Sequence, residues 1–446
     1  MDMRKTPLER WMSQRIHGRA DGELTQEGIR RYQMEKLRTV IDYVLEKSPF
    51  YRERLQEFSS RDLQCVEDLS ALPMTTAGDL RHSGPRFLCV SQSNVERVVT
   101  LPSSGKDEAP RRIYFSADDL ELTIDFFSHG MSALAHPGQR VLILMPGDRP
   151  GTVGDLLAKA LARAGIQSFV HGVVTDPAKT VSDIVDKEID CIVGIPTQVL
   201  SVARSEKANQ IPERRISSVL LSADYVPSSV INELQRVWTC KVFGHYGTTE
   251  MGLGGGVECE AFDGYHLREA DLLFEVVDPA SGRSLPDGQL GEVVFTTLTR
   301  NAMPLIRYRT GDLSRFVPEP CPCGTALRRL AKVKGKTHDG VSLRSGAWLR
   351  IADLDETLFA VPGIANYQAS LTRSNLVDHL ELIMYSGSCG HQPQLDEILG
   401  ALNSVPAITH AVETGDLIVE PIRFSTENWV TTGAAKRVIL QRSLKE

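Results

Sequence analysis

Two short motifs place residues suited to nucleotide chemistry at glycine-marked turns. Residues 244–250 read GHYGTTE, and residues 308–312 read YRTGD. Together they supply an aromatic ring, hydroxyls and two carboxylates. Magnesium prefers hard oxygen ligands and usually takes one or two protein carboxylates beside phosphate oxygens. An ionised carboxylate only accepts hydrogen bonds, which suits it to ribose hydroxyls. The two motifs therefore predict an enzyme that binds ATP and uses it to activate a second molecule.

A second set of residues has the chemistry of a metal centre. The turn at Cys321 and Cys323 directs two thiolates at one place, and Cys259 with His266 supplies the other two corners of a tetrahedron. In a reducing compartment, clustered cysteines are better interpreted as metal ligands than as a disulfide framework. A Cys3His set with no open corner predicts a structural Zn²⁺ site. The alternative is four reduced side chains in separate loops, because the one-residue spacer is tighter than the commoner two-residue one.

The composition limits the class of protein. The chain has 446 residues, of which 41% are hydrophobic and 24% charged, and its formal net charge is -7. This length exceeds what one core usually organises, so we expect two or more domains. The negative charge argues against nucleic acid as a partner. No apolar signal core follows the N-terminus and no run approaches the ~18 apolar residues of a membrane helix, so we expect a cytoplasmic protein without membrane contact.

The elements that must position the first motif alternate between strand and helix. We expect strands at 141–144, 168–170 and 191–193, with helices at 153–164 and 181–185 between them. Two further buried strands, at 219–221 and 241–243, end in polar or glycine-bearing turns. This alternation predicts an α/β fold with a doubly wound parallel sheet. Ligands in such sheets bind at the carboxyl ends of the strands.

The segments on either side of this region have different patterns of apolar residues and turns. Residues 25–55 predict a long helical segment that breaks at Ser48 and Pro49. Short apolar runs between turns at 272–297 predict antiparallel strands in a small β-barrel-like subdomain. A separate α+β segment follows, with a helix near 354–361 and a strand near 380–385. We place the domain boundary so that residues 1–334 form the large N-terminal domain and residues 335–446 a small C-terminal one.

In their order along the chain, these motifs resemble the adenylate-forming (ANL) superfamily, and within it the phenylacetate-CoA ligase branch. The resemblance also includes SPFYR at 48–52 and DLSALP at 68–73, and it extends over essentially the whole chain. It implies that ATP activates an aryl or acyl carboxylic acid to an acyl-AMP. The small, mobile C-terminal domain then rotates about residues 334–339, and coenzyme A attacks the adenylate.

The resemblance also implies roles for single residues. Glu250 would be the magnesium-associated carboxylate and Thr249 the contact to the α-phosphate, both catalytic. Tyr246 would stack on adenine and Asp312 would bind the ribose hydroxyls. The Cys3His set likewise resembles a site of this branch. The implied nucleotide-binding residues are Ser103, Ser104, Gly105, Lys106, Ala223, Asp224, Tyr246, Gly247, Thr248 and Asp312.

Two segments depart from the family pattern. The phosphate loop of the family reads SSGTTGxPK, whereas residues 103–111 read SSGKDEAPR, which brings Asp107 and Glu108 near a polyphosphate. Each carboxylate would repel it by about 1 kcal/mol if water stays between them. Near the chain end, Ala434 takes the place of the catalytic lysine. Lys436 lies two residues further on and is the remaining candidate for that role, the alternative being a solvated surface residue.

Three functions remain open on this basis. The first is an acid:CoA ligase, the second an adenylating enzyme with another acceptor, and the third a nucleotide- or acyl-adenylate-binding descendant with reduced or lost activity. The substrate would be a small carboxylic acid, and a homodimer is left open. We expect the acyl pocket to be lined by Tyr225, residues 252–256, Phe126, Phe127 and His129.

Overall fold

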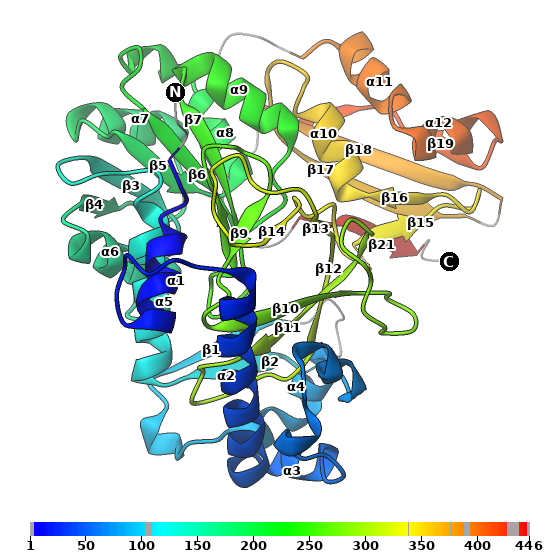
Figure 1. Cartoon of the computed structure of the whole chain (residues 1–446). Helices are drawn as coiled ribbons and strands as arrows, with labels where there is room; N and C mark the ends of the chain where they lie inside the picture. The colour runs from blue at the N-terminus through cyan, green and yellow to red at the C-terminus, as the bar shows by residue number, and fades with distance from the viewer. Residues whose placement is uncertain are drawn as a thin grey trace. The chain divides into compact units, whose positions relative to one another are not determined.

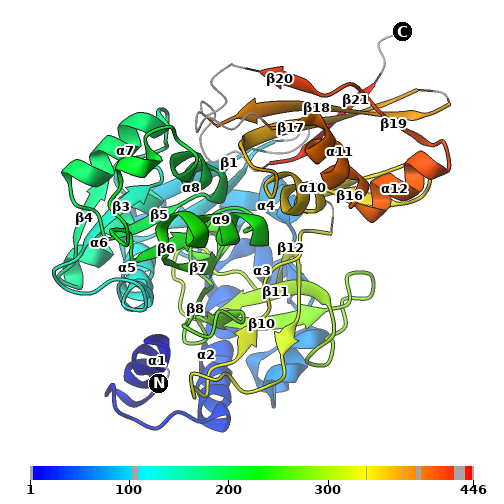
Figure 2. The ribbon, with the colours of Figure 1, turned by 90° about the horizontal axis from the view of Figure 1, so that it is seen from above.

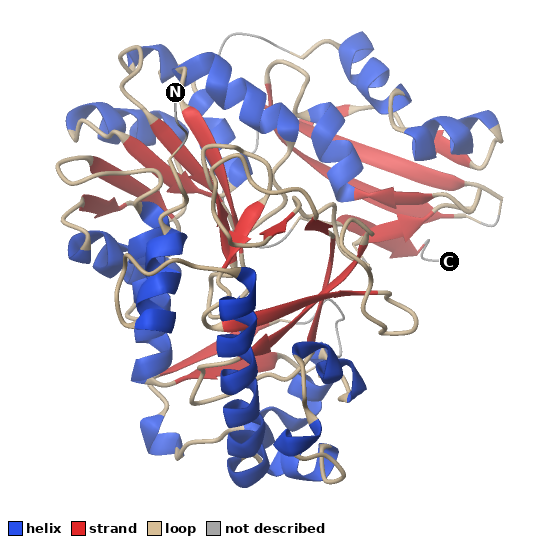
Figure 3. Cartoon of the chain, in the orientation of Figure 1, coloured by secondary structure: helices blue, strands red, loops and turns tan. Residues whose placement is uncertain are grey.

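The computed structural model describes residues 4–102, 109–337, 339–374, 376–387, 393–425 and 437–443. Its α/β architecture is shown in Figure 1, and Figure 3 separates helices from strands. The chain forms two compact units. Unit 1 contains Met1–Ala133, Lys159–Ala164 and Gly244–Val333, and unit 2 contains Leu134–Ala158, Gly165–Phe243 and Lys334–Glu446. In the described part of the chain, no helix combines the length and the apolar character that a membrane span requires.

Unit 2 contains the predicted parallel sheet. Its strands are β3 (Arg140–Leu144), β4 (Gln167–Val170), β5 (Cys191–Gly194) and β6 (Ser218–Leu221), in the order β4-β3-β5-β6 and all parallel. Every residue of β5 and β6 is buried, as expected for parallel strands covered on both faces. The intervening helices are α6 (Val153–Arg163), whose residues from Lys159 onward belong to unit 1, α7 (Pro177–Asp186), α8 (Pro196–Ala203), η5 (Ala208–Gln210) and α9 (Ser228–Trp238). The predicted alternation of strand and helix is confirmed.

The C-terminal segment of unit 2 is an α+β structure. Strands β17 (Ile364–Arg373) and β18 (Asp378–Ser386) form a long antiparallel hairpin, with helices α10 (Ile351–Leu358), α11 (Leu395–Asn403) and α12 (Pro406–Glu413) on one face of the sheet (Figure 2). Helix α10 begins earlier than predicted because the Asp353 carboxylate accepts a hydrogen bond from the backbone N–H of Arg350. The remaining strands are β15 (Gly340–Ser342), β16 (Trp348–Arg350), β19 (Leu417–Val419), β20 (Arg423–Ser425) and β21 (Ile439–Ser443).

The C-terminal segment and the parallel sheet share one hydrophobic core within unit 2. The buried side chain of Arg204 on the turn after α8 adds polar contacts, because its guanidinium donates to the carbonyls of Phe359 at 2.9 Å and Val361 at 3.2 Å. The predicted boundary after residue 334 lies beside the point where the chain passes from unit 1 to unit 2. That residues 335–446 move as a separate domain stays a prediction.

Unit 1 begins with helices. Helix α2 (Gln26–Lys47) ends where Ser48 caps α3 (Pro49–Arg54), so the predicted break at Ser48 and Pro49 is confirmed. Thr25 caps the start of α2 by accepting a hydrogen bond from Gly28 N. The other helical elements are α1 (Leu8–His17), η1 (Ser60–Asp62), η2 (Val66–Ala71), α4 (Ala77–Ser83), η3 (Gly84–Phe87), η4 (Gln92–Asn94) and α5 (Ala117–Met131).

Three antiparallel groups of strands complete unit 1. The predicted antiparallel segment forms a sheet of β10 (Leu272–Val277), β11 (Gly291–Thr297) and β12 (Tyr308–Ser314). A hairpin of β1 (Arg97–Leu101) and β2 (Arg111–Phe115) flanks the phosphate-loop segment. The third group contains β8 (Gly256–Glu258), β9 (Tyr265–Leu267), β13 (Phe316–Val317) and β14 (Arg329–Leu330). Strand β7 (Lys241–Tyr246) carries the chain from unit 2 into unit 1 and leads directly into the first motif.

Candidate active site

The first motif forms a tight turn at the end of β7. Tyr246 is the last residue of the strand, and the short helix η6 (Thr249–Met251) follows. Gly247 lies so close to the returning chain that a Cβ atom there would be 2.7 Å from the carbonyl oxygen of Leu253. Only glycine allows this approach without moving backbone. The motif is therefore held by contact between backbone segments.

The two motifs meet inside unit 1. The phenol of Tyr246 donates a hydrogen bond to Asp312 Oδ2 at 2.9 Å, and both side chains are buried. The ring of Tyr246 also stacks on Tyr265, with centroids 5.9 Å apart and an interplanar angle of 27°. Burial and the neighbouring carboxylate raise the pKa of Tyr246 well above its ordinary value, so the phenol stays protonated as a donor. Two of the residues predicted to bind nucleotide are thus brought into contact.

Glu250 is held as a buried anion. Its Oε1 atom accepts from Arg111 Nε at 2.8 Å and from the Tyr308 hydroxyl at 3.1 Å, and its backbone oxygen accepts from Arg300 Nη1 at 2.6 Å. Burial by itself raises the pKa of Glu250, but the charge of Arg111 and the hydrogen bonds keep it below its ordinary value. Neither Arg111 nor Arg300 is among the site residues predicted from the sequence. Arg111 stands where the family loop ends in lysine, and that register could have identified it.

Thr248 adds a polar atom that needs a partner. Its hydroxyl oxygen is buried, and none of the residues that the structure describes hydrogen-bonds to it. A buried polar group without a partner costs about 1–3 kcal/mol. A buried hydroxyl without a partner, two residues before Glu250 in the chain, fits a site that takes an external polar ligand.

The remaining predicted nucleotide residues lie outside the described part of the chain or in unit 2. Ser103, Ser104, Gly105 and Lys106 lie outside the described residues, as does Lys436. Ala223 and Asp224 follow β6 and belong to unit 2, where Ala223 adopts a left-handed φ of 74°. Their predicted roles stay predictions.

Two aromatic side chains that we expect to line an acyl pocket, Phe126 and Phe127, lie beside His245 near the end of β7. The ring of His245 lies 6.0 Å from Phe127 and 6.4 Å from Phe126, measured between centroids. Burial lowers the pKa of His245 to about 4, so the imidazole is neutral. A Cβ atom on Gly254 would be 2.6 Å from the Phe126 ring. Of the expected pocket residues, Tyr225 lies in unit 2 and donates to Glu356 at 2.6 Å.

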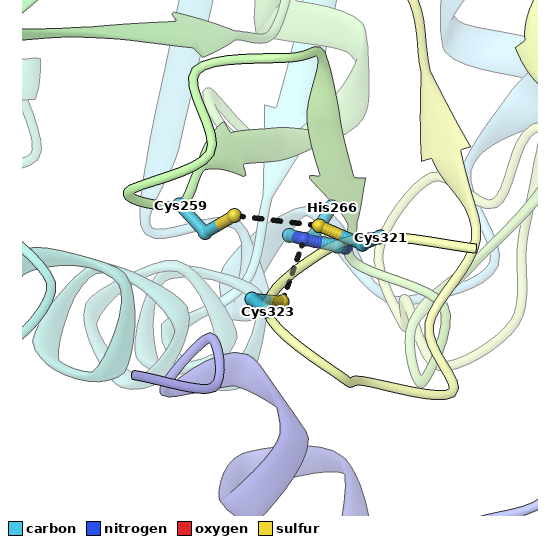
Figure 4. A group of neighbouring side chains, drawn as sticks. All are labelled: Cys259, His266, Cys321 and Cys323. Atoms are coloured by element: carbon cyan, nitrogen blue, oxygen red, sulfur yellow. Dashed lines mark hydrogen bonds between the residues drawn. The ribbon is translucent and has the colours of Figure 1, made fainter. Parts of the chain in front are cut away.

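The predicted metal ligands come together as a compact cluster. The ligand atoms of Cys259, His266, Cys321 and Cys323 all lie within 4.8 Å of one another, and all four residues are buried. The Sγ atoms of Cys259 and Cys321 are 3.6 Å apart, and Cys323 Sγ is 3.5 Å from His266 Nε2 (Figure 4). Three thiols and one imidazole around one centre are the donor set of a closed tetrahedral site. The geometry is compatible with a structural zinc ion.

One hairpin connects this cluster to the nucleotide motif. In the pairing of β8 with β9, Glu258 lies opposite Tyr265, and each is followed by a cluster residue. Glu258 Oε2 accepts a hydrogen bond from Gly244 N at 2.6 Å, while Tyr265 stacks on Tyr246. Whatever holds the four cluster residues together therefore also supports the strand that carries Tyr246.

Comparison with known proteins agrees with these motifs. Residues 151–299, which include the first motif, match the family model of the AMP-binding enzymes. A phenylacetate-coenzyme A ligase of Thermus thermophilus is 29% identical over 416 residues, or 87% of this chain and 89% of that protein. A phenylacetate-coenzyme A ligase of Aromatoleum evansii is 29% identical over 439 residues, or 94% of this chain and 96% of that protein.

A solved structure supports the fold. A 2-hydroxyisobutyryl-CoA ligase in the postadenylation state, in complex with R3-HIB-AMP, has a TM-score of 0.79 and 22% sequence identity. The likeness covers 94% of this chain and 91% of that one. The similarity thus extends through the parallel sheet, the antiparallel sheets and the C-terminal segment.

Proposed function

Because the chain belongs to the adenylate-forming superfamily, in its phenylacetate-CoA ligase-like branch, we propose that it activates a carboxylic acid with ATP and transfers the acyl group to coenzyme A. The acid would first form an acyl-adenylate and then a thioester. The observation that carries this proposal is the contact of Tyr246 with Asp312, beside the buried Glu250 carboxylate, in unit 1. A soluble small-molecule acid is the expected substrate, and a cytoplasmic location stays a prediction.

Different residues of the site would bind different parts of the nucleotide. The ring of Tyr246 is suited to an adenine face, and the Asp312 carboxylate, which only accepts hydrogen bonds, is suited to ribose hydroxyls. The buried hydroxyl of Thr248 and the neighbouring Thr249 are suited to phosphate oxygens. Glu250 would hold Mg²⁺ through a carboxylate oxygen. When bound, magnesium would neutralise charge on the phosphates during transfer.

A structural zinc ion is part of the proposal. The fit of Cys259, His266, Cys321 and Cys323 to one tetrahedral centre supports it. Its effect would be to fix the β8–β9 hairpin, and through Gly244 and Tyr265 the nucleotide motif.

The decisive experiment is ATP–pyrophosphate exchange with a panel of aryl and short-chain acyl acids, each measured with and without coenzyme A. We expect exchange with at least one acid and, on adding coenzyme A, formation of its thioester and AMP. Exchange without consumption of coenzyme A would select an enzyme with another acceptor. Absence of exchange with every acid, in a protein that binds AMP, would contradict the proposed activity.

A nucleotide-binding descendant with reduced activity is the second candidate, favoured by the sequence at residues 106–108 and by Ala434. The test restores the family pattern with the triple substitution Lys106→Thr, Asp107→Thr and Glu108→Gly. If the native loop is degenerate, exchange should rise only in the rebuilt protein. Clear exchange in the native protein that the rebuilt loop does not increase would reject this candidate.

A further inference from the structure

A second hydrogen bond joins the two motifs, with the roles of phenol and carboxylate reversed. Tyr246 of the first motif donates to Asp312 of the second, whereas the Tyr308 hydroxyl of the second donates to Glu250 Oε1 of the first at 3.1 Å. Tyr308 and Glu250 are 58 residues apart in the sequence, and both are buried. An ionised carboxylate only accepts hydrogen bonds, so the hydroxyl must be the donor. Each motif therefore supplies a donor to the carboxylate of the other.

The backbone of Tyr308 is held on both sides. In β12 it pairs with Phe295 of β11, and the centroids of the two rings are 5.5 Å apart. On the other side, Thr75 N donates to the carbonyl of Arg307 at 3.0 Å, and Arg309 N donates to the carbonyl of Thr75 at 2.9 Å. Only 3% of Tyr308 is exposed. The position of its hydroxyl is therefore determined by the fold.

The other donor to Glu250 Oε1 has a different character. Arg111 Nε donates to this oxygen at 2.8 Å, from a side chain that is 26% exposed. A long arginine side chain has many rotamers to lose, whereas a buried tyrosine ring has few. Arg111 supplies the charge that stabilises the buried anion, and Tyr308 is the donor better suited to fix its direction.

We infer that Tyr308 is a positioning residue for the carboxylate that the proposed function assigns to magnesium. Its hydroxyl holds Glu250 in one orientation before the metal binds, so that binding costs less side-chain entropy. Removing a partner that contacts the metal ligand rather than the metal typically lowers metal affinity or activity by about 10- to 100-fold. This inference rests on the proposed function, because Tyr308 acts through the Glu250 of that site.

The test compares two variants of the full chain that each lose one buried hydroxyl. Tyr308→Phe removes the donor to Glu250 and keeps both the aromatic ring and the charge of the site. Tyr51→Phe is the matched control. The Tyr51 hydroxyl accepts from Ile306 N at 2.9 Å and lies 3.0 Å from Thr75 Oγ1, so it supports the chain leading into β12 through residues other than Glu250.

The readout is the gain in nucleotide affinity that Mg²⁺ provides, measured by calorimetry without turnover. β,γ-Methylene-ATP is titrated once with Mg²⁺ and once with EDTA, and AMP is titrated with EDTA. In Tyr308→Phe we expect the gain to fall about 10-fold, because Arg111 still contacts Glu250, while AMP affinity stays near that of the wild type. Tyr51→Phe should keep the full gain, although both variants should unfold at a lower urea concentration.

Two further replacements of Tyr308 cover the case in which Tyr308→Phe does not fold. With p-aminophenylalanine, which keeps an N–H donor, the gain should be retained. With p-fluorophenylalanine, which fills the same space without a donor, the gain should be lost.

Equal losses of AMP affinity and of the Mg²⁺ gain in Tyr308→Phe would indicate a merely structural role and overturn the inference. An unchanged or larger gain in this variant, or a wild type without any gain, would overturn it as well. Selective loss of the gain in a protein without pyrophosphate exchange would support the role of Tyr308 and reject the proposed activity.

Discussion

The phenol of Tyr246 donates to Asp312 Oδ2 at 2.9 Å across 66 residues of sequence. Each residue belongs to one of the two motifs expected to bind a nucleotide, and each is buried. The hydrogen bond fixes the orientation of both the ring and the carboxylate before any ligand binds.

Replacing Tyr246 with phenylalanine tests this relationship. We expect the free energy of unfolding to fall by about 1.5–3 kcal/mol, the usual cost of losing a hydrogen bond to a charged group, and AMP affinity to fall as Asp312 loses its orientation. The measurements are chemical denaturation and calorimetry. Tyr265→Phe is the control, since it keeps a stacked ring and removes a hydroxyl that hydrogen-bonds to none of the described residues. Strictly additive effects of Tyr246→Phe and Asp312→Asn would contradict a direct coupling.

The cysteine cluster predicts a measurable metal content. The purified protein should contain about one equivalent of zinc, as a closed Cys3His site requires, and Cys323→Ser should remove it. Thermal stability and AMP affinity should fall together, because the cluster supports the hairpin that contacts Gly244 and Tyr246. Elemental analysis and calorimetry provide the readouts, and Cys65→Ser, at an exposed thiol, is the control. Less than half an equivalent of zinc in the wild type would reject the site.

Glu269 predicts a pH dependence of stability. Burial raises the pKa of its carboxyl from 4.5 to about 7, although Arg328 opposes the shift. Between these two pH values the folded protein retains a proton that the unfolded chain has released. The stabilising contribution of the protonated form is therefore complete below about pH 4.5 and is lost as the pH rises through 7.

Glu269→Gln removes this titration. The stability of the wild type relative to the variant should decrease by on the order of 3 kcal/mol between pH 4.5 and a pH above 7. Urea denaturation of both proteins at matched pH values measures the difference. A difference that stays constant, or that rises with pH, would show that Glu269 is ionised in the folded protein across this range.

The close packing at Gly254, beside the expected acyl pocket, leaves no room for a larger side chain. An alanine there would bring Cβ to 2.6 Å from the Phe126 ring, so Gly254→Ala should destabilise the protein by about 1–3 kcal/mol. Adding Phe126→Leu should restore part of the loss by making room. Gly400→Ala in α11 is the control, because a Cβ there meets nothing within 4 Å and alanine favours a helix. Thermal denaturation of the wild type, the two Gly254→Ala proteins and Gly400→Ala tests the prediction. A Gly254→Ala protein as stable as the wild type would contradict the close contact.

Local sequence patterns were sufficient to predict most of the helices and strands and the residue types of the candidate site. The apolar run of β3 and the helical pattern of α7 determine strand and helix through spacing that repeats within a few residues. The same holds for the four metal ligands, because their residue types are few and specific. These predictions needed no knowledge of how distant segments meet.

Only the tertiary structure decided which partners these elements acquired. Arg111 and Glu250 are 139 residues apart, and the residue types alone do not select this pairing among the many arginines and carboxylates of the chain. The grouping of residues 334–446 with the parallel sheet in unit 2 likewise depends on a shared core. The physical reason is that side-chain spacing sets local conformation, whereas the burial of charges and apolar surface is settled by the whole folded chain. The sequence by itself therefore determined which residues could bind a nucleotide and a metal, and the fold determined which charges hold them in place.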